Sequence, residues 1–251
     1  MADGCHVDDR LPRPCTPWTA RHTGCRIRRV KVTVDYLRRT PSAGLLVVQL
    51  AGILLYPWME DSPRGRALFT AFGLVVLGVA LRVVRRTPWL TWLAFVLAVL
   101  VVILSVIAAI APHPALPIAT AMLESAFYFY AAGSLTTYML QDWVATTDEL
   151  FAAGATFTLL AWGFAYAFVA CQALLPGSFS APIDPQGVRT WMELLFLSIA
   201  VLSGVGLSDV MPVTPQARSL VMLEAFAGVM YIALVVSRLI GLTIVNRSGR
   251  S

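Results

Sequence analysis

A short glycine-rich segment, residues 203–209, carries the most specific chemistry of the chain. It reads Ser-Gly-Val-Gly-Leu-Ser-Asp and separates an apolar run that ends at Leu202 from another that follows Pro212. Lipid cannot satisfy the backbone carbonyls of a loop at membrane depth, so such a loop must line water or bind ions. Rings of carbonyls can replace the hydration shell of a cation. The segment therefore predicts a cation path. At its mouth, Asp209 either forms an anionic ring or ties the loop to the preceding helix by a hydrogen bond.

The apolar run before this loop, Trp191 to Leu202, predicts a helix that enters the membrane without crossing it. It has about 12 residues, or about 18 Å at the helical rise, against a hydrocarbon core of about 30 Å. Thr190 and Glu193 have the spacing of a capping box, which places the helix start at Thr190. The carbonyl end of the helix carries partial negative charge and favours a cation over an anion.

Composition places these elements in a membrane. The chain is 58% hydrophobic and 13% charged, with its apolar residues in long blocks. Soluble proteins are about a quarter charged. Nine of the 19 Lys and Arg residues lie before residue 40, which predicts a basic cytoplasmic arm and argues against nucleic-acid binding. No cleavable signal peptide is evident, because the first 40 residues are polar.

The apolar blocks predict an all-α membrane protein with six transmembrane helices and a re-entrant pore helix and filter loop between the fifth and sixth. We expect three regions: a largely disordered cytoplasmic arm (1–41), a four-helix transmembrane region (42–141) and a two-transmembrane pore domain (142–251). The six runs are Ala43–Trp58, Ala67–Val84, Trp89–Ala111, Ala115–Leu140, Leu150–Leu175 and Leu220–Leu242.

Six spans with both termini in the cytoplasm satisfy the tendency of basic residues to remain inside. The arm would then lie inside with Arg82, Arg85, Arg86, Arg247 and Arg250, and the outer set would be Arg64, Arg66, Arg189 and Arg218. The glycine-rich loop would open to the outside.

From about Thr147 onward, the chain resembles the bacterial two-transmembrane pore domain of the potassium-channel superfamily. The specific part is Asp-x-x-Pro-x-Thr-Pro, beginning at Asp209, followed by Ala-Arg-Ser-Leu at 217–220. Further resembling residues lie in the last helix: Leu223-Glu224-Ala225, Gly228, Tyr231 and Arg238-Leu239. The resemblance implies a homotetramer in the bacterial inner membrane, with residues 204–208 as the selectivity filter and K⁺ or Na⁺ as the permeant ion. It implies no further cofactor.

Alignment on the aspartate sets the filter pattern Thr-Val-Gly-Tyr-Gly-Asp against residues 204–209. Gly204, Leu207 and Ser208 replace the threonine, the tyrosine and the last glycine, whereas Val205 and Gly206 match. A left-handed backbone at Ser208 would cost about 1 kcal/mol, so Ser208→Gly is expected to stabilise the tetramer. The loop would form either a wider, weakly selective pore or a non-conducting plug, and Leu207 adds a hydrophobic constriction.

Several polar or small residues near the loop have two interpretations each. Glu193 caps its helix or adds to the outer anionic field. Glu224 pairs with Arg218 or with a backbone group of the re-entrant helix, or else it contacts ions directly. Gly228 is a gating hinge or a site of close helix packing. Arg238 snorkels to the cytoplasmic interface or else faces the pore, where it would repel cations.

Other classes of protein are not supported. The fourth run contains one charge, Glu124, and no arginine, so voltage sensing is not expected. The cysteines and histidines of the arm fit no common zinc spacing, and no catalytic motif predicts an enzyme. The leading hypothesis is passive conduction of monovalent cations. The alternative is a non-conducting membrane scaffold or sensor that retains the pore fold; a secondary transporter is weaker, because the two halves show no inverted repeat.

Overall fold

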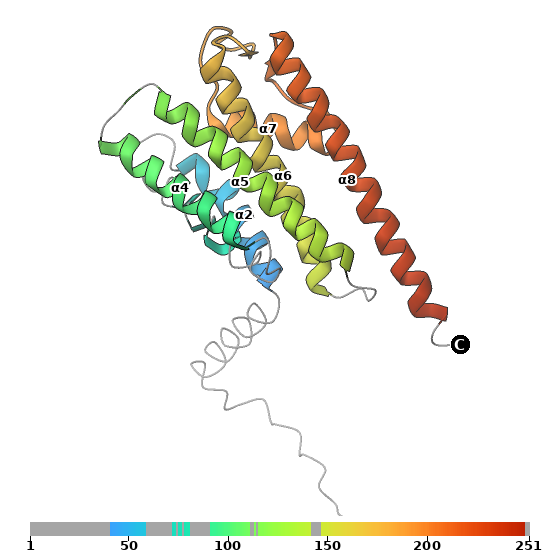
Figure 1. Ribbon diagram of the computed structural model, residues 1–251. Coiled ribbons are helices and arrows are strands. Elements are labelled where there is room, and N and C mark those ends of the chain that lie inside the picture. Colours follow the sequence, from blue (N-terminus) through green and yellow to red (C-terminus); the bar gives the residue numbers. More distant parts are fainter. Residues whose placement is uncertain are drawn as a thin grey trace, which may run out of the picture. The chain divides into compact units, whose positions relative to one another are not determined.

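The computed structural model describes residues 41–58, 72–73, 75–76, 78–80, 91–110, 113, 115–141 and 147–248 (Figure 1). The chain divides into two units, Met1–Arg39 and Thr40–Ser251, and every helix and strand below belongs to the second. The predicted arm up to residue 40 lies outside the described residues. So do most of the predicted run Ala67–Val84 and the basic residues Arg64, Arg66, Arg82, Arg85, Arg86 and Arg250.

The described chain is mostly helical, as predicted. Its elements are α2 (Pro41–Leu55) with the 3-10 turn η1 (Tyr56–Trp58), α4 (Thr91–Ile110), α5 (Ala115–Gln141), α6 (Thr147–Leu174), β1 (Phe179–Ser180), α7 (Trp191–Leu202), β2 (Met211–Pro212) and α8 (Pro215–Ser248). The two strands correct the all-α prediction, because Phe179 pairs with Pro212 and Ser180 with Met211 in an antiparallel ladder. Isolated strands of two residues carry no periodic signal in a sequence.

Two of the described helices are long and apolar enough to cross a membrane, Asp148–Leu174 and Pro215–Arg238. Shorter apolar helices cover Ser42–Trp58, Trp92–Ile107 and Trp191–Leu202. These apolar helices fit the predicted membrane protein, whereas the number of six spans stays a prediction.

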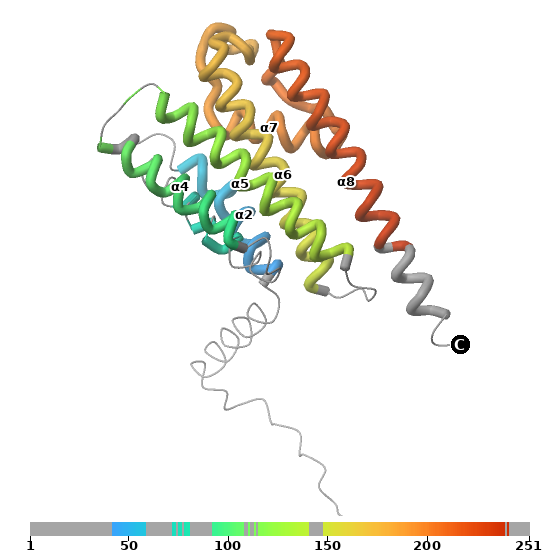
Figure 2. The backbone as a smooth tube through the Cα atoms, viewed as in Figure 1, coloured from blue at the N-terminus to red at the C-terminus, as the bar shows by residue number. Residues whose placement is uncertain are grey.

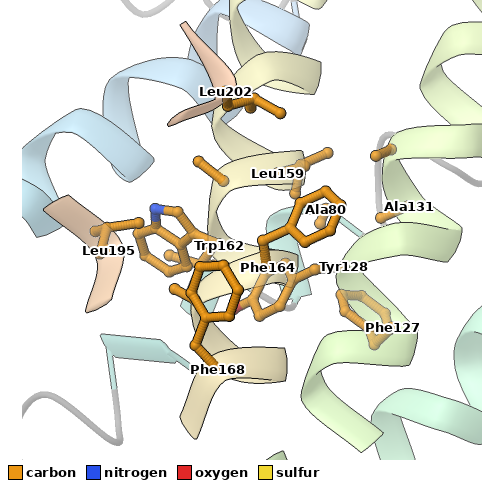
Figure 3. Packing of buried hydrophobic residues seen from close by; sticks show 14 of the residues in the cluster. Ala80, Phe127, Tyr128, Ala131, Leu159, Trp162, Phe164, Phe168, Leu195 and Leu202 are labelled. Atoms are coloured by element: carbon orange, nitrogen blue, oxygen red, sulfur yellow. The ribbon is translucent and has the colours of Figure 1, made fainter. Parts of the chain in front are cut away.

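Helix α6 is the centre of the described core. It contacts α2, α5, α7 and α8, and α8 contacts α6, α7 and β2 (Figure 2). Trp162 of α6 is fully buried and meets Tyr128 of α5 edge to face, with ring centroids 5.6 Å apart (Figure 3). Its ring also meets Trp191 of α7 edge to face, at 5.2 Å. Edge-to-face pairs add about 0.5–1.5 kcal/mol beyond the burial of area. This aromatic layer fixes α7 against α6.

Helix α8 starts five residues before the apolar run that predicted it. Pro215 occupies its first position, and Thr214 caps it, because the Thr214 hydroxyl accepts a hydrogen bond from the Ala217 amide at 3.3 Å. Proline is favoured there, since its missing N–H has no partner in the first turn of a helix. The chain thus turns directly from β2 into a long helix.

Candidate functional site

The short helix α7 confirms the sequence prediction in its bounds and in its cap. It runs from Trp191 to Leu202, and Thr190 and Glu193 form the complete capping box. The Thr190 amide donates to Glu193 Oε2 at 2.6 Å, and the Glu193 amide donates to Thr190 Oγ1 at 3.3 Å. Of its two interpretations, Glu193 therefore performs the capping role.

Arg189, immediately before this helix, is a structural residue that sequence reasoning assigned only to the outer set of charges. Its side chain is buried and donates to the carbonyls of Asp184 (2.5 Å) and Gly187 (3.1 Å) and to Glu193 Oε1 (3.2 Å). Its backbone exchanges two hydrogen bonds with the Gln172 side chain of α6. Arg189 thereby fastens the connection between α6 and α7, and no motif in the sequence signalled this.

The segment between β1 and β2, which contains α7 and the glycine-rich loop, is an excursion from the helix pair α6 and α8: it leaves the end of α6 and returns beside it to the start of α8. Strands β1 and β2 lie at its two ends and pair with each other. Beyond the ladder, the Val213 amide donates to the Ser178 carbonyl at 2.9 Å, and the Thr214 hydroxyl donates to Ser178 Oγ at 3.2 Å. The excursion therefore begins and ends at the same end of α6 and α8.

The glycine-rich loop folds back on the last turn of α7. The Gly204 amide donates to the Val201 carbonyl at 3.0 Å, and the Gly206 amide donates to the Ala200 carbonyl at 2.8 Å. Gly204 and Gly206 have φ values of 75° and 68°, in the left-handed region that favours glycine. Part of the carbonyl end of the helix is thus closed by the loop itself.

The backbone strain that the sequence predicted at Ser208 is absent from the structure. Among the described residues, positive φ occurs only at glycines, namely Gly177, Gly204 and Gly206. The left-handed positions are therefore Gly204 and Gly206, and the prediction of strain at Ser208 is wrong. The Ser208 hydroxyl instead accepts a hydrogen bond from the Val210 amide at 3.1 Å. The alignment failed because it assumed the conformation of the resembled loop.

The remaining loop residues point outward. Val205 and Leu207 are 71% and 72% exposed, and Asp209 is also exposed. Within the described part of the chain, no hydrogen bond ties the Asp209 side chain to α7, and both predicted roles of Asp209 stay predictions.

Glu224 is fully buried in α8, and its partner lies on α7. The partner is the hydroxyl of Ser198, which contacts Glu224 Oε1. The predicted partner Arg218 instead donates from Nε to the Pro212 carbonyl at 3.3 Å. The expected link to the short helix therefore exists, but through a side chain. The only hydroxyl inside this helix was the signal that could have found it.

Gly228, one turn further along α8, is a site of close packing. A Cβ at this position would overlap the carbonyl of Leu202. Helix α8 runs without interruption through Gly228 from Pro215 to Ser248. Gly228 therefore allows close packing of α8 against the end of α7.

Two more polar contacts fasten the second half of α8 to α6. The Tyr231 hydroxyl donates to the Ala153 carbonyl at 2.5 Å, and Arg238 Nη2 lies 3.4 Å from Glu149 Oε2. The Arg238 and Glu149 side chains are 13% and 4% exposed. Glu224, Tyr231 and Arg238 follow each other at seven-residue spacing, so they share one face of α8. Arg238 is thus paired with a carboxylate of α6, a partner that the sequence did not indicate.

The described chain contains a long apolar helix, a short capped helix, a glycine-rich loop and a second long apolar helix, in the order expected from the sequence. The comparison with family models agrees: residues 154–244 match the family described as ion channel. This match confirms the resemblance to the potassium-channel superfamily over residues 154–244 and supports a pore domain of this kind there. No curated protein and no solved structure matches the chain.

Proposed function

We propose that the protein is a homotetrameric channel that conducts monovalent cations passively through the loop 204–208. The observation that carries this proposal is the paired excursion between β1 and β2. A chain that leaves and returns at one end of two apolar helices supports a re-entrant loop, and irregular backbone at membrane depth must line water or ions.

Electrostatics favour cations. The loop follows the carbonyl end of α7, and a helix carries about half a negative charge at this end. Four exposed Asp209 side chains around a common axis would concentrate cations further. Among the described residues from Gly204 to Val210, Asp209 is the one charged side chain.

The proposed pore selects weakly among cations. In a potassium filter, a ladder of carbonyl rings dehydrates the ion. Here the Gly206 amide uses the Ala200 carbonyl, and the left-handed residues lie at Gly204 and Gly206. We expect fewer dehydrated sites, a permeability that differs little between K⁺ and Na⁺, and a hydrophobic constriction at Leu207.

We further propose the surroundings of this pore. Residues 142–251 form the pore domain, 42–141 form four helices around it, and the basic arm 1–41 lies in the cytoplasm with the C-terminus. The protein then spans the inner membrane six times, and its mouth, with Asp209, opens to the outside.

Ion flux into liposomes tests the proposal. Purified full-length protein, shown to be tetrameric by cross-linking in the same detergent, is reconstituted, and K⁺, Na⁺ and Rb⁺ uptake are followed against empty liposomes. The proposal predicts uptake of all three ions. It also predicts that the permeability ratio of K⁺ to Na⁺, obtained from reversal potentials, is less than about ten. A confirmed tetramer without flux would favour the non-conducting scaffold or sensor instead.

A further inference from the structure

Glu224 and Ser198 form a buried contact whose chemistry depends on which oxygen carries each hydrogen. The Ser198 oxygen contacts two groups, the Ala161 carbonyl of α6 at 2.9 Å and Oε1 of Glu224. Both Ser198 and Glu224 are fully buried. The three groups come from α6, α7 and α8, so this contact joins the three helices that carry the loop.

Counting donors favours one arrangement of these hydrogens. A serine hydroxyl has one hydrogen, a backbone carbonyl has none, and an ionised carboxylate only accepts. With an ionised Glu224, the single Ser198 hydrogen would face two acceptors. With a neutral acid, the Glu224 O–H donates to Ser198, and the Ser198 O–H donates to the Ala161 carbonyl. Both contacts then have a hydrogen.

The charged groups nearby do not change this result. Of the arginines of α6, α7 and α8 whose side chains the structure describes, Arg218 donates to the Pro212 carbonyl and Arg238 pairs with Glu149; Arg247 lies near the end of α8, 23 residues beyond Glu224. The acidic side chains are Asp148, which accepts from Ser42, Glu149, which pairs with Arg238, and Glu193, which pairs with Arg189. An unpaired buried carboxylate is strongly disfavoured, which supports the neutral acid.

We infer that Glu224 is a neutral carboxylic acid that positions the end of α7 through a hydrogen-bond chain from Glu224 to Ser198 to Ala161. Ser198 and Leu202 lie one turn apart on α7, and Glu224 and Gly228 lie one turn apart on α8. Ser198 contacts Glu224 through the hydrogen-bond chain, and Leu202 contacts Gly228 by packing. Glu224 is thus a positioning residue for Gly204 and the loop that follows. Its effect on conduction rests on the proposed function, but its protonation does not.

Infrared spectroscopy of the full-length protein tests the protonation directly. A neutral carboxyl group has a C=O band above the amide band that shifts downward in D₂O, whereas a carboxylate lacks it. The wild-type spectrum minus that of Glu224→Gln is expected to contain this band. The matched control is Glu124→Gln, a glutamate of α5, whose loss must leave the Glu224 band in place. A Glu224→Gln difference that contains carboxylate bands alone would overturn the inference.

Conservative and truncating variants test the positioning role. The glutamine amide can donate to Ser198 as the acid does, so Glu224→Gln is expected to keep the melting temperature within about 2 °C of the wild type. Glu224→Ala removes the donor and is expected to lower it by about 5 °C or more. If both variants melt alike, the hydrogen-bond chain has no positioning role. Both readouts need no flux, so a non-conducting protein would contradict the proposed function and leave this inference intact.

Discussion

Gly228 of α8 packs directly against the backbone carbonyl of Leu202, the residue with which α7 ends. The glycine-rich loop begins at the next residue. Any shift of α8 along this contact therefore reaches the base of the loop, because a carbonyl in contact with a Cα cannot yield independently of it. This is the shortest structural connection between the last helix and the proposed ion path.

Replacing Gly228 by alanine should separate the two helices. The added Cβ overlaps the Leu202 carbonyl, and overpacking of this kind costs about 1–3 kcal/mol. We expect the melting temperature of the purified protein to fall by roughly 3–10 °C. The control is Gly133→Ala on an exposed face of α5, where a Cβ meets no atom within 4 Å and alanine favours the helix. Equal melting temperatures for the two variants would argue against the contact.

The left-handed glycines make a prediction opposite to that of the sequence alignment. Gly206→Ala forces a Cβ into a positive φ and should destabilise the protein by about 1 kcal/mol, although the space around it is open. Ser208→Gly relieves no strain and removes the hydrogen bond to the Val210 amide. We expect an unchanged or lower melting temperature for Ser208→Gly, measured beside wild type. A clear rise in the melting temperature of Ser208→Gly would support the strained backbone that the alignment predicted at this position.

The buried pair of Glu149 and Arg238 should behave as a unit. Removing one partner of a buried pair leaves an uncompensated charge and costs about 3–5 kcal/mol, so Glu149→Gln and Arg238→Gln should each be strongly destabilising. The double variant should be less destabilised than the sum of the two. A denaturation-based double-mutant cycle measures this difference, and a coupling energy above about 1 kcal/mol is expected. Arg218→Gln, on an exposed arginine, is the control, and strictly additive effects would contradict the pair.

The sequence predicted the elements of the site better than its contacts. The bounds of α7 followed from Thr190 and Glu193, because a capping box is a local signal. The contact of Glu224 with Ser198 joins residues 26 positions apart and depends on how α7 and α8 pack. Arg238 was assigned to the interface for the same reason, since its partner Glu149 lies 89 positions away. Tertiary partners of this kind leave no pattern in a single sequence.

The error at Ser208 has a different origin. The sequence contains two glycines at alternate positions, and the structure places positive φ at both. The alignment on Asp209 predicted left-handed backbone at Ser208, two residues beyond Gly206, where the structure has it. Glycine itself was the better guide, because it is the residue that adopts this conformation at low cost.

The central claim is that ions pass along the exposed loop at the end of α7, and thiol modification of Leu207→Cys tests it most directly. Currents through the reconstituted variant are recorded before and after a membrane-impermeant cationic thiol reagent is added to the outer side. The controls are wild type, whose described cysteine Cys171 is buried, and Val188→Cys, an exposed position outside the loop. The account predicts that the reagent blocks Leu207→Cys and neither control. Undiminished current through fully modified Leu207→Cys would contradict it.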